Sequence, residues 1–274
     1  MFQRLLVCVV ISVVIQSARS LIASSHFPQR VRSVIQRTSR RAVIDRGSTL
    51  QMGAGKRLRK SEKDAQRLEK DAVKADLQIK TDKLAEELVE QCSMPERDLA
   101  CINGIIQHVR AVSTPLEPAR SPYLNHDWRL VFATDNDAIS AVGTGLHTLP
   151  LTRMQEMFVS FRGGTMMSVE TLEVLRVLGP FPNVRNKLSG DRSTTGPQSV
   201  RVRYTSMVDG NGRKTGSEHT GAPDRLVDID IVHVGEEAMV VLTPPSSKQP
   251  KGGQLVFVRE RDVTAALEEL RVNG

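Results

Sequence analysis

The residues whose types and spacing could carry out chemistry are few, and two aspartates come first. Asp228 and Asp230 stand two positions apart in an alternating segment, so their side chains would share one face of a strand. If that face lined a cavity, the two carboxylates could act as an acid pair. If Val227, Ile229 and Ile231 face the core instead, both carboxylates point to solvent. We favour the second arrangement and predict no catalytic residue.

Metal and cofactor sites have no matching pattern in the sequence. The histidines, at positions 26, 108, 126, 147, 219 and 233, lack the paired spacing of metal ligands, and there is no Gly-x-Ser-x-Gly segment. Residues 53–57 lack the first glycine and the final Ser or Thr of a phosphate-binding loop. The sequence therefore predicts no metal and no cofactor.

Cysteines are too few for a disulfide framework. Cys8 lies in an apolar leader, which leaves Cys92 and Cys101 in a helical stretch. A separation of nine residues is not a recognised redox spacing, so we expect two buried thiols; a redox pair is the alternative.

The net charge of +7 is concentrated at the start of the chain. The first 52 residues carry eight arginines against one acid, Asp45, which leaves 30 basic and 30 acidic residues after Met52. A neutral body lacks the excess positive charge that phosphate binding requires. We therefore expect no nucleic-acid partner.

The first 55 residues read as a targeting sequence in two parts. Residues 1–20 have a positive start, an apolar run at 5–15 and small residues before a cleavage point at Ser20, as in a signal peptide. Residues 21–55 form a basic, Ser-rich arm that is typical of a transit peptide and is expected to be disordered. This combination is similar to the leaders of algae whose plastids lie inside the endomembrane system. We expect a plastid protein whose mature form begins well after Ser20; plain secretion is the alternative.

Residues 56–120 are expected to form a helical lead-in. The stretch from Lys56 to Ala111 has no aromatic residue and one proline, Pro95. One helix is expected to begin near Ser61, with an apolar stripe at Leu68, Ala72, Ala75, Ile79, Leu84 and Leu88. A second helix is expected to begin near Pro95 and to bury Leu99, Ile102, Ile106 and Val109. The charges of the 56–90 helix are expected to face solvent; a protein partner docked on it is the alternative.

Residues 121–274 change to the alternating pattern of strands. All eight aromatic residues that follow the leader lie between Tyr123 and Phe257. Strands are expected at 128–133, 159–162, 172–178, 184–189, 200–205, 226–233, 238–243 and 254–260. Short helices are expected at 150–157 and 262–271. With no long helices between the strands, the sheet must be antiparallel, so we expect a mainly β domain, a meandering barrel or sandwich.

Three segments carry a family resemblance. Asn125 to Thr134, with the pattern Trp-x-Leu-x-Phe-x-Thr, resembles the first strand of the plastid lipid-associated (fibrillin) family. Val184 to Leu188 resembles that family's internal Val-x-Asn strand, and Gly252 to Val258 its closing strand. The similarity spans roughly residues 85–262. Asp127 stands where the family often has Gly, and Pro245 to Lys248 replaces an acidic segment.

The resemblance implies a lipocalin-like β-barrel, preceded by two helices and closed by a short C-terminal helix, that binds an apolar molecule such as a lipid, carotenoid or quinone at a thylakoid or plastoglobule surface. A barrel of about eight strands has room for side chains or one small ligand, so a cavity and a filled core are equally compatible with the alternation. The residues expected to face the interior are Trp128, Leu130, Phe132, Val202, Tyr204 and Phe257. Arg259 is expected to close one end by packing over Trp128.

Two other functions remain open at this point. One is an enzyme on the same barrel that acts on an apolar plastid metabolite with Asp228, Asp230, His233 or Tyr204. The other is an interaction scaffold whose active surface is the charged 56–90 helix.

Overall fold

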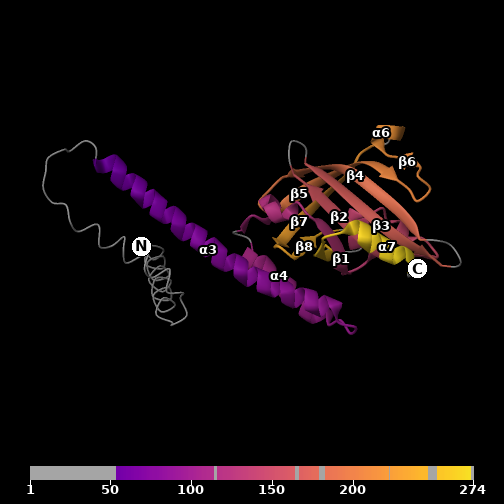
Figure 1. The fold of residues 1–274 in the computed structure, drawn as a ribbon, viewed down its shortest axis with the longest axis horizontal. Coiled ribbons are helices and arrows are strands. Elements are labelled where there is room, and N and C mark those ends of the chain that lie inside the picture. The colour runs from indigo at the N-terminus through magenta and orange to yellow at the C-terminus, as the bar shows by residue number, and fades with distance from the viewer. Residues whose placement is uncertain are drawn as a thin grey trace, which may run out of the picture. The chain divides into compact units, whose positions relative to one another are not determined.

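The computed structural model describes residues 54–113, 116–163, 167–178, 183–221, 223–245 and 252–272. The signal peptide and nearly all of the basic arm expected from the sequence lie outside these ranges. The chain divides into two units, Met1–Lys63 and Asp64–Gly274, and the second contains the sheet (Figure 1).

Within the described residues, nine antiparallel strands form one sheet, in the order β4-β3-β2-β1-β9-β8-β7-β5-β6. Strand β4 also pairs with β5, so eight of the strands are linked in a closed ring, while the two-residue β6 pairs with the end of β5. The mainly β, antiparallel class expected from the sequence is confirmed. The strands are β1 (Asp127–Ala133), β2 (Thr152–Arg162), β3 (Ser168–Val177), β4 (Val184–Thr194), β5 (Ser199–Val208), β6 (Lys214–Thr215), β7 (Arg225–Val234), β8 (Ala238–Leu242) and β9 (Gln254–Glu260).

Helices precede, interrupt and follow the strands. The α-helices are α3 (Ala54–Ser93), α4 (Leu99–Ser113), α5 (Asn136–Val142), α6 (Ser217–Thr220) and α7 (Val263–Val272). Short 3₁₀ helices are η2 (Pro118–Arg120), η3 (Pro122–Leu124) and η4 (Leu146–Thr148). Helix α4 begins later than expected, because Asp98 Oδ1 accepts from the backbone N–H groups of Ala100 and Cys101 and so caps the helix four residues past the expected start at Pro95.

The helix expected at 150–157 is wrong, because this segment is the first half of β2. Residues 152–162 pair with β3 throughout, and an extra residue, Gln155, bulges out of the ladder between Met154 and Glu156. The bulge lets Met154 and Met157, three residues apart, both pack against the same core. A spacing of three between buried residues is typical of a helix, which explains the error.

Two hydrophobic cores lie on the two faces of the sheet. The first, here called the ring core, gathers buried side chains from all eight strands of the ring, so it lies on the inner face. The second, here called the helix core, joins the outer face of β1, β7, β8 and β9 to helices α3 and α4. Strands covered on both faces read as continuous apolar runs, as in β8.

The helix core supplies a partner for Leu84 and Leu88 of the stripe expected on α3, whereas Leu68 and Ile79 of that stripe are exposed. Leu88 and Cys92 of α3, with Ile102, Ile106 and Val109 of α4, pack against Phe132, Val232, Val240 and Val256 of the sheet. Burial raises the pKa of the Cys92 thiol to about 11, so the thiolate is not the form present near neutral pH. Both Cys92 and Cys101 are free thiols, Cys92 buried and Cys101 half-buried.

Helix α7 lies against another part of the sheet's outer face (Figure 1). Arg185 of β4 donates from Nη2 to the carbonyl of Leu267 at 2.9 Å, and Asn183 donates to the carbonyl of Leu270 at 3.4 Å. Leu270 lies in the last turn of the helix, where carbonyl groups lack a donor within the helix, and Asn183 supplies one. The C-terminal helix expected at 262–271 is confirmed.

Candidate functional site

The apolar inner face of the ring is the first candidate site, and five of the six residues expected to line the interior lie on it. Trp128, Val202, Tyr204 and Phe257 are buried in the ring core, and Leu130 packs against it. They come from strands β1, β5 and β9. The structure therefore brings these five side chains to one face.

Phe132 is the exception, and its expected place in the interior is corrected. The pairing of β1 with β9 shifts by one residue between Leu130, opposite Phe257, and Phe132, opposite Val256. This bulge reverses the phase of the strand, so Phe132 turns outward into the helix core while Trp128 stays in the ring core. The alternation of the sequence along 128–132 places Trp128, Leu130 and Phe132 on one face and gives no sign of the extra residue between Leu130 and Phe132.

One end of the ring is closed around Trp128. The indole Nε1 donates to the carbonyl of Leu124 at 3.3 Å, which ties β1 to the preceding η3 turn. Arg259 of β9 is the register partner of Trp128 and is half-buried, with its guanidinium 3.8 Å from Glu236. The cation–π contacts found among the described residues are others, Arg192 over Phe161 and Arg225 over Tyr204.

The opposite end of the ring is closed by α5, which is held through its C-terminal carbonyl groups. The hydroxyl of Tyr204 donates to the carbonyl of Val142 at 2.9 Å. The guanidinium of Arg225 donates to the carbonyl groups of Ser140, Ala141 and Gly143. A cation at a helix C-terminus also complements the helix dipole, so Arg225 both caps and anchors α5.

A buried carboxylate lies beside this anchor. Glu173 is fully buried on the inner face of β3, and its carboxylate accepts from the backbone N–H and the hydroxyl of Thr144. Burial raises the pKa of Glu173, while the two bonds from Thr144 and the nearby His147 and Arg225 act in the opposite direction. Gly143 leaves room for this group, because a Cβ there would lie 2.0 Å from Glu173 Oε1.

Two buried polar atoms near Glu173 lack hydrogen-bond partners. Asn186 is the register partner of Glu173 on β4; its Oδ1 accepts from Gly210 N at 3.1 Å, but its Nδ2 has no partner. His147 is in contact with the carbonyl of Asn136 through Nε2 at 3.2 Å, whereas its Nδ1 has no partner. The sequence pattern did not predict this polar end of the ring. The sequence signal for it is the spacing of two between Val169, Thr171 and Glu173, which places all three side chains on the same face of β3.

The four residues considered for an enzyme do not come together. Tyr204 is in the ring core, and burial raises its pKa to about 12. Asp228 is on the outer face, paired with Arg201 at 2.7 Å, and this partner lowers the pKa of Asp228. Asp230 accepts from the hydroxyl of Ser199 at 2.6 Å. Both aspartates line a surface cavity of about 400 Å³ next to Pro244 and Pro245.

His233, the fourth, is buried on the outer face against α3. Its Nε2 lies 3.5 Å from Asp82 Oδ1 without a hydrogen bond, and burial lowers the pKa of His233 to about 4. The imidazole is therefore neutral near pH 7. It lines a small cavity of about 180 Å³ between α3 and the β7–β8 turn.

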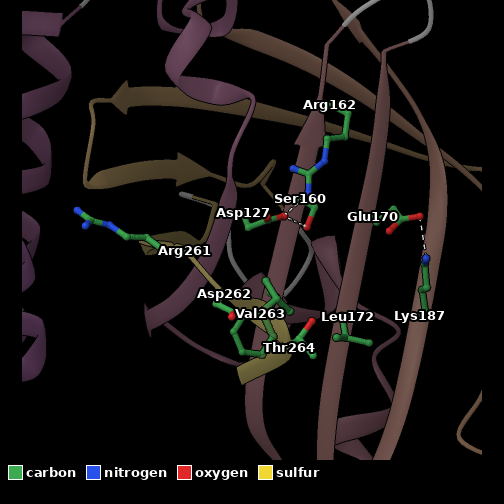
Figure 2. A pocket seen from close by; sticks show the side chains of 11 residues that line it. Asp127, Ser160, Arg162, Glu170, Leu172, Lys187, Arg261, Asp262, Val263 and Thr264 are labelled. Atoms are coloured by element: carbon green, nitrogen blue, oxygen red, sulfur yellow. Dashed lines mark hydrogen bonds and ion pairs between the residues drawn. The ribbon is translucent and has the colours of Figure 1, made fainter. Parts of the chain in front are cut away.

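Another cavity, of about 400 Å³, lies where the start of α7 meets the outer face of β1 to β4 (Figure 2). Its charges are already paired across strands: Arg162 with Asp127 at 2.6 Å, and Lys187 with Glu170 at 2.8 Å. Asp262 caps α7 by accepting from Ala265 N at 3.0 Å. Since these groups neutralise one another, the cavity presents no concentrated charge of either sign.

Comparison with known proteins finds no family model and no curated protein that matches the chain. Among the described residues, no three His, Cys, Asp or Glu side chains are grouped so that they could hold a metal ion. None of the described helices is long and apolar enough to span a bilayer.

Proposed function

We propose that this protein is a non-catalytic binding protein for an apolar small molecule, a lipid, carotenoid or quinone, held inside a lipocalin-like barrel. The observation that carries the proposal is the closed pairing of eight strands around an inner face lined by Trp128, Leu130, Val202 and Phe257. Eight strands are the number at which a closed sheet has an interior suited to side chains or one small ligand. Apolar lining with a few polar groups at one end is typical of such sites.

The arrangement of the resemblance motifs supports the same proposal. The Trp-containing segment and the closing Gly-x-hydrophobic-Phe-Val segment, far apart in sequence, are neighbours on β1 and β9. Leu130 is directly opposite Phe257 in that pairing. A barrel whose first and last strands are hydrogen-bonded requires this proximity.

The proposed setting is the thylakoid or plastoglobule surface of an algal plastid. This part rests on the leader and the resemblance, and plain secretion is its alternative. The body after Met52 is formally neutral, which suits a protein that meets membranes through apolar molecules rather than through anionic headgroups. N-terminal sequencing of the native protein tests the setting, because a mature start at Leu21 would favour secretion.

The proposed ligand is tested by mass spectrometry of what copurifies with the protein from its native membrane. The proposal expects one class of apolar molecule at close to one per chain, retained after detergent exchange. A mixture of membrane lipids in their bulk proportions, lost on exchange, would contradict it.

A second function, as an interaction scaffold, is favoured by a separate observation. Leu68 and Ile79 on α3 have relative exposures of 70% and 57%. Exposed large apolar residues that recur on one helix face mark an interaction surface.

A further inference from the structure

The first part of α3 that belongs to the sheet-containing unit has no packing partner within the described chain. The side chains of residues 66–76 are all exposed. Residues 77 and 78 are half-buried, and full burial begins at Thr81 and continues through Ala85, Leu88 and Cys92. A surface-exposed helix of this length gains little stability from propensity alone, so contacts with another molecule would add to it.

The exposed apolar residues are not an extension of the packed stripe. Leu68, Ala72, Ala75 and Ile79 recur at intervals of four, three and four, which aligns them on one face. At about 100° per residue, this face lies roughly 150° around the helix from the one that carries Ala85 and Leu88. Here it is called the free stripe. Docking of α3 on the sheet therefore leaves the free stripe uncovered.

The spacing of the free stripe is that of a coiled-coil seam. Alternating intervals of four and three place its residues at successive core positions of a heptad. Two of the four are alanines, which allow a second helix to approach closely. One further helix with apolar residues at its own core positions can pack against such a seam and bury it.

Acidic residues border the free stripe on both sides. Asp64 and Asp71 lie along one border, and Glu69 and Asp76 along the other. Asp76 also pairs with Lys80 of its own helix at 2.8 Å. The basic residues Arg67, Lys70 and Lys74 lie toward the opposite side of the helix. The charges next to the seam are therefore of one sign.

We propose that the free stripe binds an amphipathic helix of a partner protein whose flanking positions are basic. In a two-stranded coiled coil the flanking positions of the two helices face one another, so acidic borders select a basic partner. A second copy of this chain would set acid against acid in either orientation. Anionic lipid would meet the same repulsion. The inference does not depend on the ligand of the ring.

A designed peptide pair tests the proposal with the full chain. Both peptides have about three heptads with Leu at the core positions; one has Lys and the other Glu at the flanking positions. Fluorescence anisotropy of the labelled peptides should show the Lys peptide binding at least about ten-fold more tightly than the Glu peptide. The preference should decrease as salt increases.

Two variants separate docking on the stripe from general charge attraction. The double substitution Leu68→Asn and Ile79→Asn keeps the charge and should weaken binding of the Lys peptide about ten-fold or more. Val73→Asn, which changes a residue of 55% exposure on another face, should leave it unchanged. Circular dichroism confirms that both variants remain folded.

Four results would overturn the proposal. Equal binding of the two peptides, or equal loss in both variants, would mean that the stripe does not select its partner. A dimeric mass by light scattering that becomes monomeric in the double variant would identify a second copy as the occupant. Binding to vesicles with anionic lipid that is lost in the double variant, without peptide selectivity, would identify a membrane.

Discussion

Trp128 and Arg259 lie directly opposite each other on the neighbouring strands β1 and β9. Side chains of directly opposed residues in an antiparallel pair share a face and contribute roughly 0.2–1 kcal/mol. Arg259 has 26% of its side chain exposed, whereas Arg261 has 75% exposed and pairs with Glu237 at 2.8 Å.

Replacement of Arg259 should therefore cost more stability than replacement of Arg261. We expect Arg259→Leu to lower the free energy of unfolding and to shift the emission of Trp128, because Arg259 lies directly opposite Trp128 and most of its side chain is buried. Urea unfolding of both variants measures the difference. Equal effects on stability and no change in emission would reject the pairing.

Tyr204 and α5 provide a test of how the second end of the ring is held. Tyr204→Phe removes the hydroxyl bonds to Val142 and Thr171 and keeps the ring of the side chain. We expect a loss of about 1–3 kcal/mol, since a buried carbonyl loses its donor. Hydrogen exchange should accelerate within 136–148, with little change in β7 to β9. Uniform acceleration across the sheet would show that the hydroxyl supports the whole fold rather than α5.

The buried His233 should make the folded protein less stable in acid. Its pKa of about 4 in the folded protein lies below the ordinary value of 6.5, because burial disfavours the charged ring. The unfolded chain therefore takes up a proton first as pH falls, so this stability is complete above about pH 6.5 and is lost toward pH 4.

The matched variant is His233→Phe, which keeps an aromatic ring and cannot titrate. The free-energy difference between wild type and this variant should change by several-fold more between pH 6.5 and 4 than between pH 8 and 6.5. Asp82→Asn is the control for the neighbouring carboxylate, whose pKa burial raises. A pH-independent difference would show that His233 does not carry the acid sensitivity.

Replacement of Leu88 and of Leu68 on α3 tests whether the helix core attaches α3 to the sheet. Leu88 is fully buried, whereas Leu68 is 70% exposed. Leu88→Ala should lower the free energy of unfolding by about 2–5 kcal/mol and Leu68→Ala by less than about 0.5 kcal/mol. Chemical denaturation followed by Trp128 emission and by helical circular dichroism gives both values. If Leu88→Ala left the Trp128 transition in place, α3 would not be part of the cooperative unit.

The sequence predicted where several strands begin and end, but not every face to which their side chains point. β9 was expected at 254–260 and β7 at 226–233, close to their observed bounds. Prediction failed where a bulge changes the phase. The extra residue in β1 sends Phe132 outward, and that in β2 puts Met154 and Met157 on one face at helical spacing. A bulge depends on how two strands pair, so the sequence of one strand alone does not predict it.

The polar end of the candidate site was hidden for a related reason. Glu173 looks like a solvent-facing residue in isolation, since a glutamate is seldom fully buried. Its burial follows from a tertiary contact, the two bonds from Thr144, which lies 29 residues earlier in a turn. Short helix α5, which precedes that turn, was likewise not foreseen, since seven residues give too little periodicity to recognise.

The bulge in β1 also provides the control that the central claim needs. Phe257 lies in the ring core and Phe132 in the helix core, although β1 and β9 are neighbours. Both are buried phenylalanines, so their replacement by alanine has a similar cost in stability, about 3–5 kcal/mol. Only Phe257 lies on the face where a ligand would be held.

The most direct measurement is a titration of Trp128 emission with an isoprenoid quinone in the wild-type protein, Phe257→Ala and Phe132→Ala, each confirmed folded by circular dichroism. The account predicts saturable quenching that a fatty acid reverses by competition. Phe257→Ala should weaken binding about ten-fold, because about 50 Å² of lost apolar contact at roughly 25 cal/mol per Å² is close to 1.3 kcal/mol. Phe132→Ala should leave the affinity unchanged. Linear, non-saturable quenching that is the same in all three proteins would contradict the claim, since it would mean that the quinone meets the protein only at its surface.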